Sequence, residues 1–192
     1  DATGRVALYC VEAADGHTIT CVIMYGWTGG AQKSSDAART DDMLRITFRE
    51  LAAQPDGPKL IMGDLNATIS DLPTLQTALD DTDDDNFHAW HDVGAKADLW
   101  GGAPNEPTCV APNAKQATRR DYVIANNIAF GLIEDFNITW NEIYKVHASI
   151  QFTLNLKPLV VKKRVVNNAG SFYDKLPEMV REEFGYAEYD TF

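Results

Sequence analysis

The sequence predicts an α/β fold made of layers of helix and sheet, and three stretches carry that prediction. Residues 5–11 and 18–24 are rich in Val, Ile, Tyr and Thr and are joined through an Asp-Gly pair, which is typical of a β-hairpin. Residues 44–51 repeat apolar side chains at i, i+4 and i+7, as one stripe of a helix does. A buried strand, residues 60–62, then follows. Strand, helix and strand in this order indicate layered packing.

The composition is that of an ordinary globular chain with a strong acidic balance. Of 192 residues, 45% are hydrophobic and 23% charged, and the net charge is −11. The length suggests one domain, with room for an extension, and no apolar run approaches the roughly 20 residues that a membrane-spanning helix needs. An acidic chain is poorly suited to grip a phosphate backbone over a wide surface. A small basic site, or one bridged by a metal, is compatible with it.

The predicted first helix has a start signal and a stop signal. Ser35 is expected as its N-cap, and three aspartates, beginning with Asp36, favour its early turns. The Pro- and Gly-containing residues 54–58 end it. A second, short helix is expected at residues 71–79, with leucines on one side.

Three further strands are expected in the second half of the chain. Residues 119–124 pass from two arginines through Asp121 into an apolar run. Residues 132–140 alternate loosely. Residues 146–156 alternate well, so one face should be buried and the other, which carries His147, polar.

Two groups of potential metal ligands are better explained without a metal. Residues 80–85 hold five carboxylates but lack the Gly and Glu of a calcium-binding EF-hand loop, so we favour a solvated loop over a calcium site. His88 and His91 flank a tryptophan with no third ligand in register. We therefore favour surface or core-edge histidines over a metal pair.

The three cysteines, Cys10, Cys21 and Cys109, show no spacing for zinc. Cys10 and Cys21 could face each other across the hairpin as a disulfide. Two buried thiols are the preferred alternative, because the odd count argues against a disulfide framework.

The strongest candidate site lies where the buried strand ends, at residues 63–66. Asp64 and Asn66 would project to the same face if the extended conformation continues past Gly63. A carboxylate beside a neutral amide suits an attacking water, because the acid takes or orients its proton and the amide holds an oxygen. The alternative is a strand that runs into a polar turn, where Asp-x-Asn is common.

Four places, in order along the chain, resemble the endonuclease/exonuclease/phosphatase superfamily, and within it the endonuclease domains of non-LTR retrotransposons. Residues 22–26 are similar to that family's strand ending in a functional Tyr, and residues 63–66 to its Gly-Asp-x-Asn signature. Residues 119–122 are similar to its Arg-x-Asp-Tyr strand start. His147 stands where the closing motif of the family has its His. The resemblance covers residues 5–156.

The resemblance implies a two-sheet β-sandwich flanked by helices that hydrolyses phosphodiester bonds with Mg²⁺ or Mn²⁺. In that scheme Asp64 would orient or deprotonate the attacking water, and Asn66 would hold the scissile phosphate. His147 would stabilise charge on the phosphorane oxygens, with Asp121 orienting its ring. Tyr25 would contact phosphate.

By the same analogy Arg39 is a further candidate for a phosphate contact.

Two departures from the family pattern predict a degenerate site. Val146 stands where the family has an acid before the His, and the family's opening strands, one with the Glu that binds metal, have no counterpart before Asp1. We therefore expect a partial sandwich with weak or no nuclease activity, and the metal ligands stay unassigned.

Residues 1–157 are expected to form this domain, and residues 158–192 a basic and aromatic C-terminal extension that docks on another surface. A partial sandwich leaves sheet edges and an apolar face uncovered, so we expect another protein chain to cover them. DNA is an expected partner only if the site is active. The rival hypothesis is a domesticated, non-catalytic remnant that serves as a structural or interaction subunit of a larger assembly.

Overall fold

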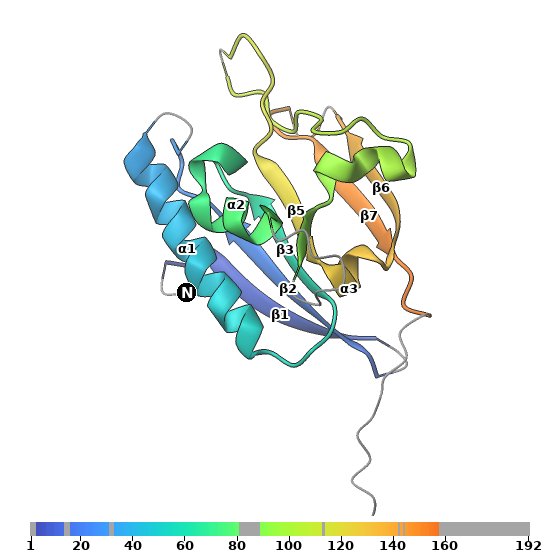
Figure 1. Cartoon of the computed structure of the whole chain (residues 1–192). Helices are drawn as coiled ribbons and strands as arrows, with labels where there is room; N and C mark the ends of the chain where they lie inside the picture. The colour runs from blue at the N-terminus through green and yellow to red at the C-terminus, as the bar shows by residue number, and fades with distance from the viewer. Residues whose placement is uncertain are drawn as a thin grey trace, which may run out of the picture. The chain divides into compact units, whose positions relative to one another are not determined.

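A computed structural model describes residues 3–13, 16–30, 33–80, 89–112, 114–141, 143 and 145–157 (Figure 1). Its strands and helices alternate along the chain as the sequence predicts. In chain order they are β1 (Val6–Glu12), β2 (Thr18–Tyr25), α1 (Ser34–Ala53), β3 (Lys59–Asp64), the 3₁₀ helix η1 (Ile69–Asp71), α2 (Pro73–Asp80), β4 (Trp90–Asp92), the 3₁₀ helix η2 (Gly94–Trp100), β5 (Asp121–Asn126), α3 (Asn127–Phe130), β6 (Ile133–Thr139) and β7 (Ser149–Leu154).

The described strands form two sheets. The larger has the order β1-β2-β3-β5-β4, and β6 pairs with β7 in the smaller. The β1–β2 pair is antiparallel, as the predicted hairpin requires, and β2 is parallel to β3 with α1 as the crossover between them. The predicted fold class is therefore confirmed: an α/β fold with two β-sheets flanked by helices.

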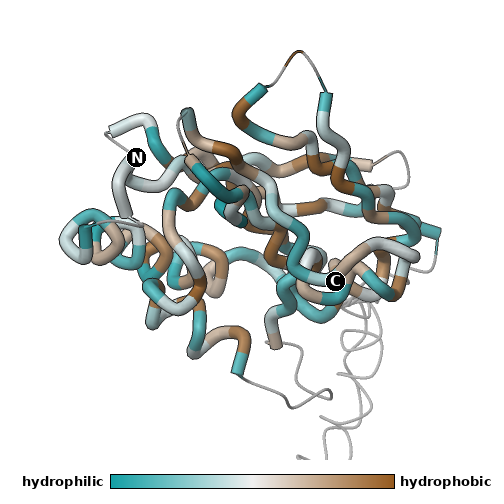
Figure 2. The backbone as a smooth tube through the Cα atoms, turned by 90° about the horizontal axis from the view of Figure 1, so that it is seen from above, coloured by the Kyte–Doolittle hydropathy of each residue, from teal (hydrophilic) through white to brown (hydrophobic). Residues whose placement is uncertain are grey.

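One face of the five-stranded sheet packs against α1 and α2 (Figure 1). The apolar stripe predicted for α1 is responsible, because Leu44 and Leu51 are fully buried there. They meet residues of the strands at alternate positions, including Val22, Ile61 and Ile124. In the tube of Figure 2, hydrophobic and hydrophilic residues are interspersed along the described chain. The central strands β2, β3 and β5 place apolar residues on both faces of the sheet, because alternate residues of each strand belong to two different core clusters.

The other face, which we call the inner face, looks toward β6 and β7. The three apolar cross-strand pairs of the smaller sheet point at it: Ile133–Leu154, Phe136–Phe152 and Ile138–Ile150. They pack with Leu60 of β3 and with Val123 and Ala125 of β5. The polar pairs between them face the opposite way, so the smaller sheet is amphipathic as predicted for residues 146–156.

The smaller sheet covers only part of the inner face. In the strand register, Ile23 of β2 stands beside Met62 of β3 and then Val123 of β5 on one row. Val123 is buried, whereas Ile23 is 44% exposed and Tyr9, on the next row, is 55% exposed. We call β3 and β5 the covered half of the inner face and β1 and β2 its open half.

Two predictions about the local structure are wrong, and one needs a change of bounds. Lys33, and not Ser35, is the N-cap of α1, and no side chain caps this helix end. The helix expected at residues 71–79 forms as α2, but it begins at Pro73, after the short η1. Cys10 is exposed and not buried, and Cys10 and Cys21 pair with different residues of the opposite strand, so their side chains lie on opposite faces of the hairpin.

Several predictions concern residues outside the described ones. These are residues 81–85 of the acidic loop, His88 and the C-terminal extension 158–192, so the domain boundary stays a prediction. His91 is a buried core-edge histidine between Asn127 and Lys96, as favoured above. Among the described helices, none is long and apolar enough to cross a membrane.

Candidate active site

The candidate site lies at one edge of the inner face, where β2 and β3 end and β5 begins. Tyr25, Asp64 and Asp121 occupy one row across these three strands. Directly paired residues of neighbouring strands point to the same side of a sheet. The two carboxylates predicted from separate motifs therefore stand side by side, on the same face as the core beneath the smaller sheet.

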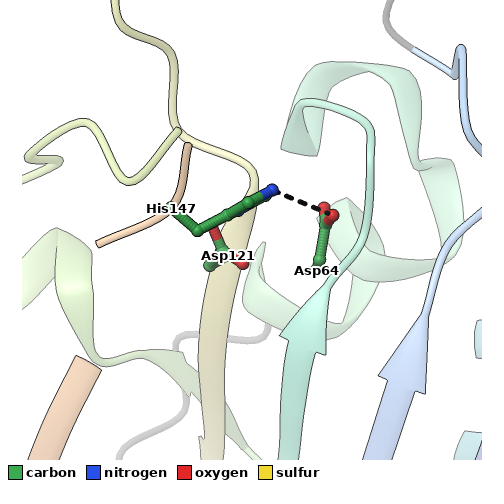
Figure 3. Close-up of side chains that lie close together, drawn as sticks. All are labelled: Asp64, Asp121 and His147. Atoms are coloured by element: carbon green, nitrogen blue, oxygen red, sulfur yellow. Dashed lines mark hydrogen bonds and ion pairs between the residues drawn. The ribbon is translucent and has the colours of Figure 1, made fainter. Parts of the chain in front are cut away.

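His147 completes this group from above the sheet (Figure 3). It lies just before β7, in a bridge with Cys109 that fixes its backbone. Its Nδ1 is 2.9 Å from Oδ2 of Asp121, and its Nε2 is 3.9 Å from Oδ2 of Asp64. Since a carboxylate accepts, Nδ1–H donates to Asp121, and the imidazole then presents Nε2 toward Asp64.

Asn66 reaches the site by a different route from the one the strand pattern predicts. The strand ends at Asp64, and Asn66 has a left-handed backbone with φ of 52°. Its backbone N–H donates to Oδ1 of Asp64 over 2.8 Å, as in an Asx turn. Its side-chain amide donates to the carbonyl of Gly26 over 3.3 Å. The strand continues past Gly63 to Asp64 but ends there, so the polar turn held open as the alternative forms at Asn66.

The environment of Asp64 raises the pKa of its carboxyl group. Burial is the largest cause, and the negative charge of Asp121 adds to it. The hydrogen bond from Asn66 and the charges of His147 and Arg120 oppose the shift. A carboxylate that is partly desolvated and beside a like charge is a stronger base than one in water.

Thr108 positions the backbone of Asp121, and the neighbouring Arg119 is held by Asp92. Thr108 is fully buried, and its hydroxyl accepts the backbone N–H groups of Arg120 and Asp121 over 3.0 and 2.9 Å. Arg119, the arginine of the Arg-x-Asp-Tyr segment, donates through Nη1 to Oδ2 of Asp92 over 2.7 Å, and its Nη2 contacts the other oxygen of that carboxylate. Both terminal nitrogens of the Arg119 guanidinium are therefore used in a bidentate contact with Asp92. Arg119 is thus assigned a structural role and not a role in binding substrate.

The sequence motifs assign no role to two side chains near the site, Cys109 and Arg120, although Arg120 lies inside the Arg-x-Asp-Tyr segment. Cys109 is buried, with Sγ 3.9 Å from Nε2 of His147, and burial, Asp121 and Asp64 raise the pKa of its thiol. Arg120 carries a buried Nη1 that has no hydrogen-bond partner among the described residues. Their positions follow from strand pairing between distant segments, which no local pattern of sequence announces.

The remaining predicted residues, Tyr25 and Arg39, lie outside the Asp64, Asp121 and His147 group. Tyr25 is exposed and neighbours Asp64 only through the strand register. Arg39 lies on α1, with Cζ 4.9 Å from the ring centroid of Trp27. Both are at the same edge of the sheet as Asp64, but the structure assigns them to the flank of the site.

The group of Asp64, Asp121 and His147 fits a divalent cation. One ligating atom from each lies within 4.8 Å of the others. Two carboxylates close together match the oxygen ligands that Mg²⁺ and Mn²⁺ prefer. The nature of the metal does not follow from this donor set.

Solved structures with a similar fold include members of the endonuclease/exonuclease/phosphatase superfamily. The 3′ phosphatase NExo from Neisseria, bound to a product DNA hairpin, matches with a TM-score of 0.58 and 12% identity over 79% of this chain and 65% of that one. The catalytic domain of APE2 from Xenopus laevis gives a TM-score of 0.50 and 14% identity, over 79% of this chain and 56% of that one.

TDP2 from C. elegans gives a TM-score of 0.51 and 12% identity, over 78% of this chain and 46% of that one. This chain therefore spans about two thirds of the length of NExo and less of the other two. At these identities the likeness is one of fold. No protein-family model and no curated protein matches the sequence.

Proposed function

We propose that the chain is a hydrolase of phosphodiester bonds in DNA, of the retroelement endonuclease type, with weak activity on its own. The observation that carries the proposal is the convergence of Asp64, Asp121 and His147 from three distant segments at one edge of the sheet. The fold shared with nucleases and phosphatases supports it. One of these proteins, NExo, is bound to a product DNA hairpin in its structure, which also supports it. The order of the sequence motifs supports the retroelement type.

In this proposal Asp64 accepts the proton of the attacking water. Its raised pKa suits that role, because a stronger base takes a larger share of the proton in the transition state. His147, held through Nδ1 by Asp121, presents Nε2 to the space above Asp64 where a phosphate would lie. An imidazolium there would stabilise the charge that develops on the phosphorane oxygens.

Mg²⁺ or Mn²⁺ is the proposed cofactor, and the carboxylate of Asp121 would hold it, which leaves the carboxylate of Asp64 to act as the base. When bound, the cation supplies Lewis-acid stabilisation of the phosphoryl oxygens. We attribute the weak activity to a sparse ligand set. Among the described residues the site contributes two carboxylates, and the residue before His147 is Val146, which cannot add a third.

The test is nicking of supercoiled plasmid by the chain with Mg²⁺ or Mn²⁺. Asp64→Asn keeps the size of the side chain but removes the base, so we expect a loss of roughly 10²- to 10⁴-fold. Asp98→Asn is the matched control, because Asp98 is an exposed aspartate away from the site. Equal nicking by the Asp64→Asn variant and the unmodified chain would contradict the proposal.

The second candidate function is that of a non-catalytic structural or interaction subunit, and the open half of the inner face favours it. Tyr9, Val11 and Ile23 expose apolar surface on one continuous patch of β1 and β2. Contiguous patches of this kind mark contacts with another chain. The proposed partner is a second protein chain that lies over this patch, next to the core already formed under β6 and β7.

A binding measurement separates the two functions. A chain that serves as a subunit should associate through the patch whether or not Asp64 is present. We therefore expect Asp64→Asn to self-associate as the unmodified chain does in sedimentation velocity, while Ile23→Thr associates less. If the chain nicks plasmid while it stays monodisperse and unassociated, the hydrolase proposal stands and the subunit proposal loses its support.

A further inference from the structure

Beside the candidate active site, two arginines from distant parts of the chain lie against one tryptophan. Cζ of Arg5 is 4.2 Å from the ring centroid of Trp27, and Cζ of Arg39 is 4.9 Å from it. Arg5 also lies 5.3 Å from the ring centroid of Tyr25. We call Arg5, Trp27 and Arg39 the arginine–tryptophan cluster. At these distances each guanidinium is attracted by the electrons of the indole ring.

The fold holds the cluster in place from both sides. The backbone N–H of Trp27 donates to Oγ1 of Thr40 over 2.9 Å, and Thr40 is fully buried on α1. Thr40 adjoins Arg39 in the helix, so the same contact that anchors the turn after β2 sets Arg39 beside the ring. A cluster built on a helix and a strand end is better ordered than one on a free loop.

The cluster continues directly from the active-site turn. The carbonyl of Gly26 accepts Nη1 of Arg5 over 3.0 Å and the side-chain amide of Asn66 over 3.3 Å. The backbone N–H of Gly26 in turn donates to the carbonyl of Asp64 over 2.6 Å. Arg5 and Asn66 thus share one acceptor. The arginine–tryptophan cluster and the candidate active site therefore lie next to each other along one edge.

Local charge at this edge contrasts with the acidic chain as a whole. Two guanidiniums, those of Arg5 and Arg39, lie at this edge, and Arg39 pairs with the carboxylate of Asp36, whose Oδ1 is 3.6 Å from its Nη1. The Arg39 side chain is 60% exposed, so its remaining donors reach solvent. Arginine beside aromatic rings is the combination that binds nucleic-acid strands, because guanidinium forks match phosphate and bases stack on rings.

We propose that the arginine–tryptophan cluster binds a phosphate next to the scissile one on a single strand of nucleic acid. The inference rests on the proposed function, because the scissile phosphate is placed at Asp64, Asp121 and His147. It names the substrate class more narrowly: a strand with at least two consecutive phosphates. A phosphomonoester of a sugar has no second phosphate to place against Arg5 and Arg39.

The test measures binding without cleavage. A fluorescein-labelled single-stranded oligonucleotide is titrated with the chain in EDTA, and anisotropy gives Kd at several salt concentrations. We expect Arg39→Ala to weaken binding roughly tenfold, as for one lost charge-assisted hydrogen bond. The slope of log Kd against log salt should fall by about 0.7, the change expected for one phosphate contact on a single strand.

Arg45→Ala is the matched control. Arg45 lies on the same helix, its side chain is 63% exposed, and it pairs with Asp42 three residues earlier as Arg39 pairs with Asp36. Charge, helix propensity and exposure therefore change alike in the two variants, which differ in position and in the contact of Arg39 with Trp27. We expect Arg45→Ala to bind as the unmodified chain does.

The outcomes separate this inference from the hydrolase proposal. If Arg39→Ala selectively weakens oligonucleotide binding and the chain nicks no plasmid, the proposed role of the cluster is supported and the hydrolase proposal is contradicted. Equal Kd values for the Arg39→Ala and Arg45→Ala variants overturn the cluster, even in a chain that nicks plasmid. Absence of any oligonucleotide binding overturns it as well. Circular dichroism of the Arg39→Ala variant, which changes an exposed helical residue, confirms that the fold is retained.

Discussion

The two faces of the five-stranded sheet are built from the same strands but are covered differently. The face toward α1 and α2 is closed, with Val22, Ile61 and Ile124 buried across three neighbouring strands. On the inner face, burial is complete at Val123 of β5 and is lost by Ile23 of β2. The continuous apolar runs of β3 and β5 thus predict two apolar faces, but only partners from elsewhere in the chain decide how much of each is buried.

The candidate active site lies on the boundary between the covered half and the open half of the inner face. On its row, Asp121 stands on β5 in the covered half, Asp64 on β3, and Tyr25 on β2 in the open half. One side of the site therefore rests on a packed core while the other meets solvent. The comparison predicts that substitutions should become less costly from the covered half toward the open half.

The largest expected effect tests the covered half. Phe136 is 3% exposed beneath the smaller sheet, so Phe136→Ala should lower the free energy of unfolding by about 3–5 kcal/mol. Tyr9→Ala, on the open half, removes an aromatic ring that is already exposed and should cost less than about 1 kcal/mol. Urea denaturation followed by circular dichroism measures both. Equal losses would mean that the open half is covered in solution.

A smaller effect concerns the closed face. Burial is the main cause that raises the pKa of Tyr122 to about 12, from an ordinary value of 10.0. The unfolded chain then releases this proton first as pH rises, so its contribution is complete below pH 10 and is lost toward pH 12. We expect the stability of the unmodified chain to fall more steeply over that range than that of Tyr122→Phe, measured by denaturant unfolding at each pH. Parallel curves would contradict the closed environment.

The boundary itself is tested through Asp64. Its pKa is raised above 3.8, so the folded chain holds this proton more tightly than the unfolded chain. The stability from this group is therefore present at low pH and declines as pH rises through the raised pKa, and Asp64→Asn removes the decline. Any hydrolysis that uses Asp64 as a base should lose activity on acidification at a pH above that of an ordinary aspartate. Carboxyl NMR titration of the metal-free chain gives the shift directly.

The smallest change in stability is expected on the open half, where the effect is on association. Ile23 is 44% exposed on β2, and Ile46 is 46% exposed on α1. Ile23→Thr and Ile46→Thr should each change the free energy of unfolding by less than about 0.5 kcal/mol. Only Ile23→Thr should reduce self-association and binding of a hydrophobic dye. Equal reductions of self-association and dye binding by both variants would show that the open half is not the surface through which the chain associates.

Sequence reasoning succeeds where local chemistry decides the structure. The Asp-Gly hairpin, the end of α1 before Pro55 and the strand into Asp64 depend on turn residues and periodicity close in the chain. The meeting of Asp64 with Asp121 and His147 was anticipated only through the order of motifs shared with a known family. Geometry along a single strand does not contain it.

What could not be predicted depends on contacts between distant segments. Arg5 and Trp27 are far apart in sequence, and their contact follows from the pairing of β1 with β2 and the anchor on Thr40. Asn66 leaves the strand because its backbone turns left-handed and hydrogen-bonds Asp64, a choice that Asp-x-Asn permits but does not force. The partial burial of the inner face is likewise a property of the assembled layers.

Gly26 joins the candidate active site to the arginine–tryptophan cluster. A Cβ at this position would lie 2.0 Å from the carbonyl oxygen of Leu65, so the two turns touch backbone to backbone. Any larger residue would wedge the turn after β2 away from the turn after β3. A Gly26→Ala chain should keep each end's residues but lose their alignment, so a strand of nucleic acid could satisfy one end at a time.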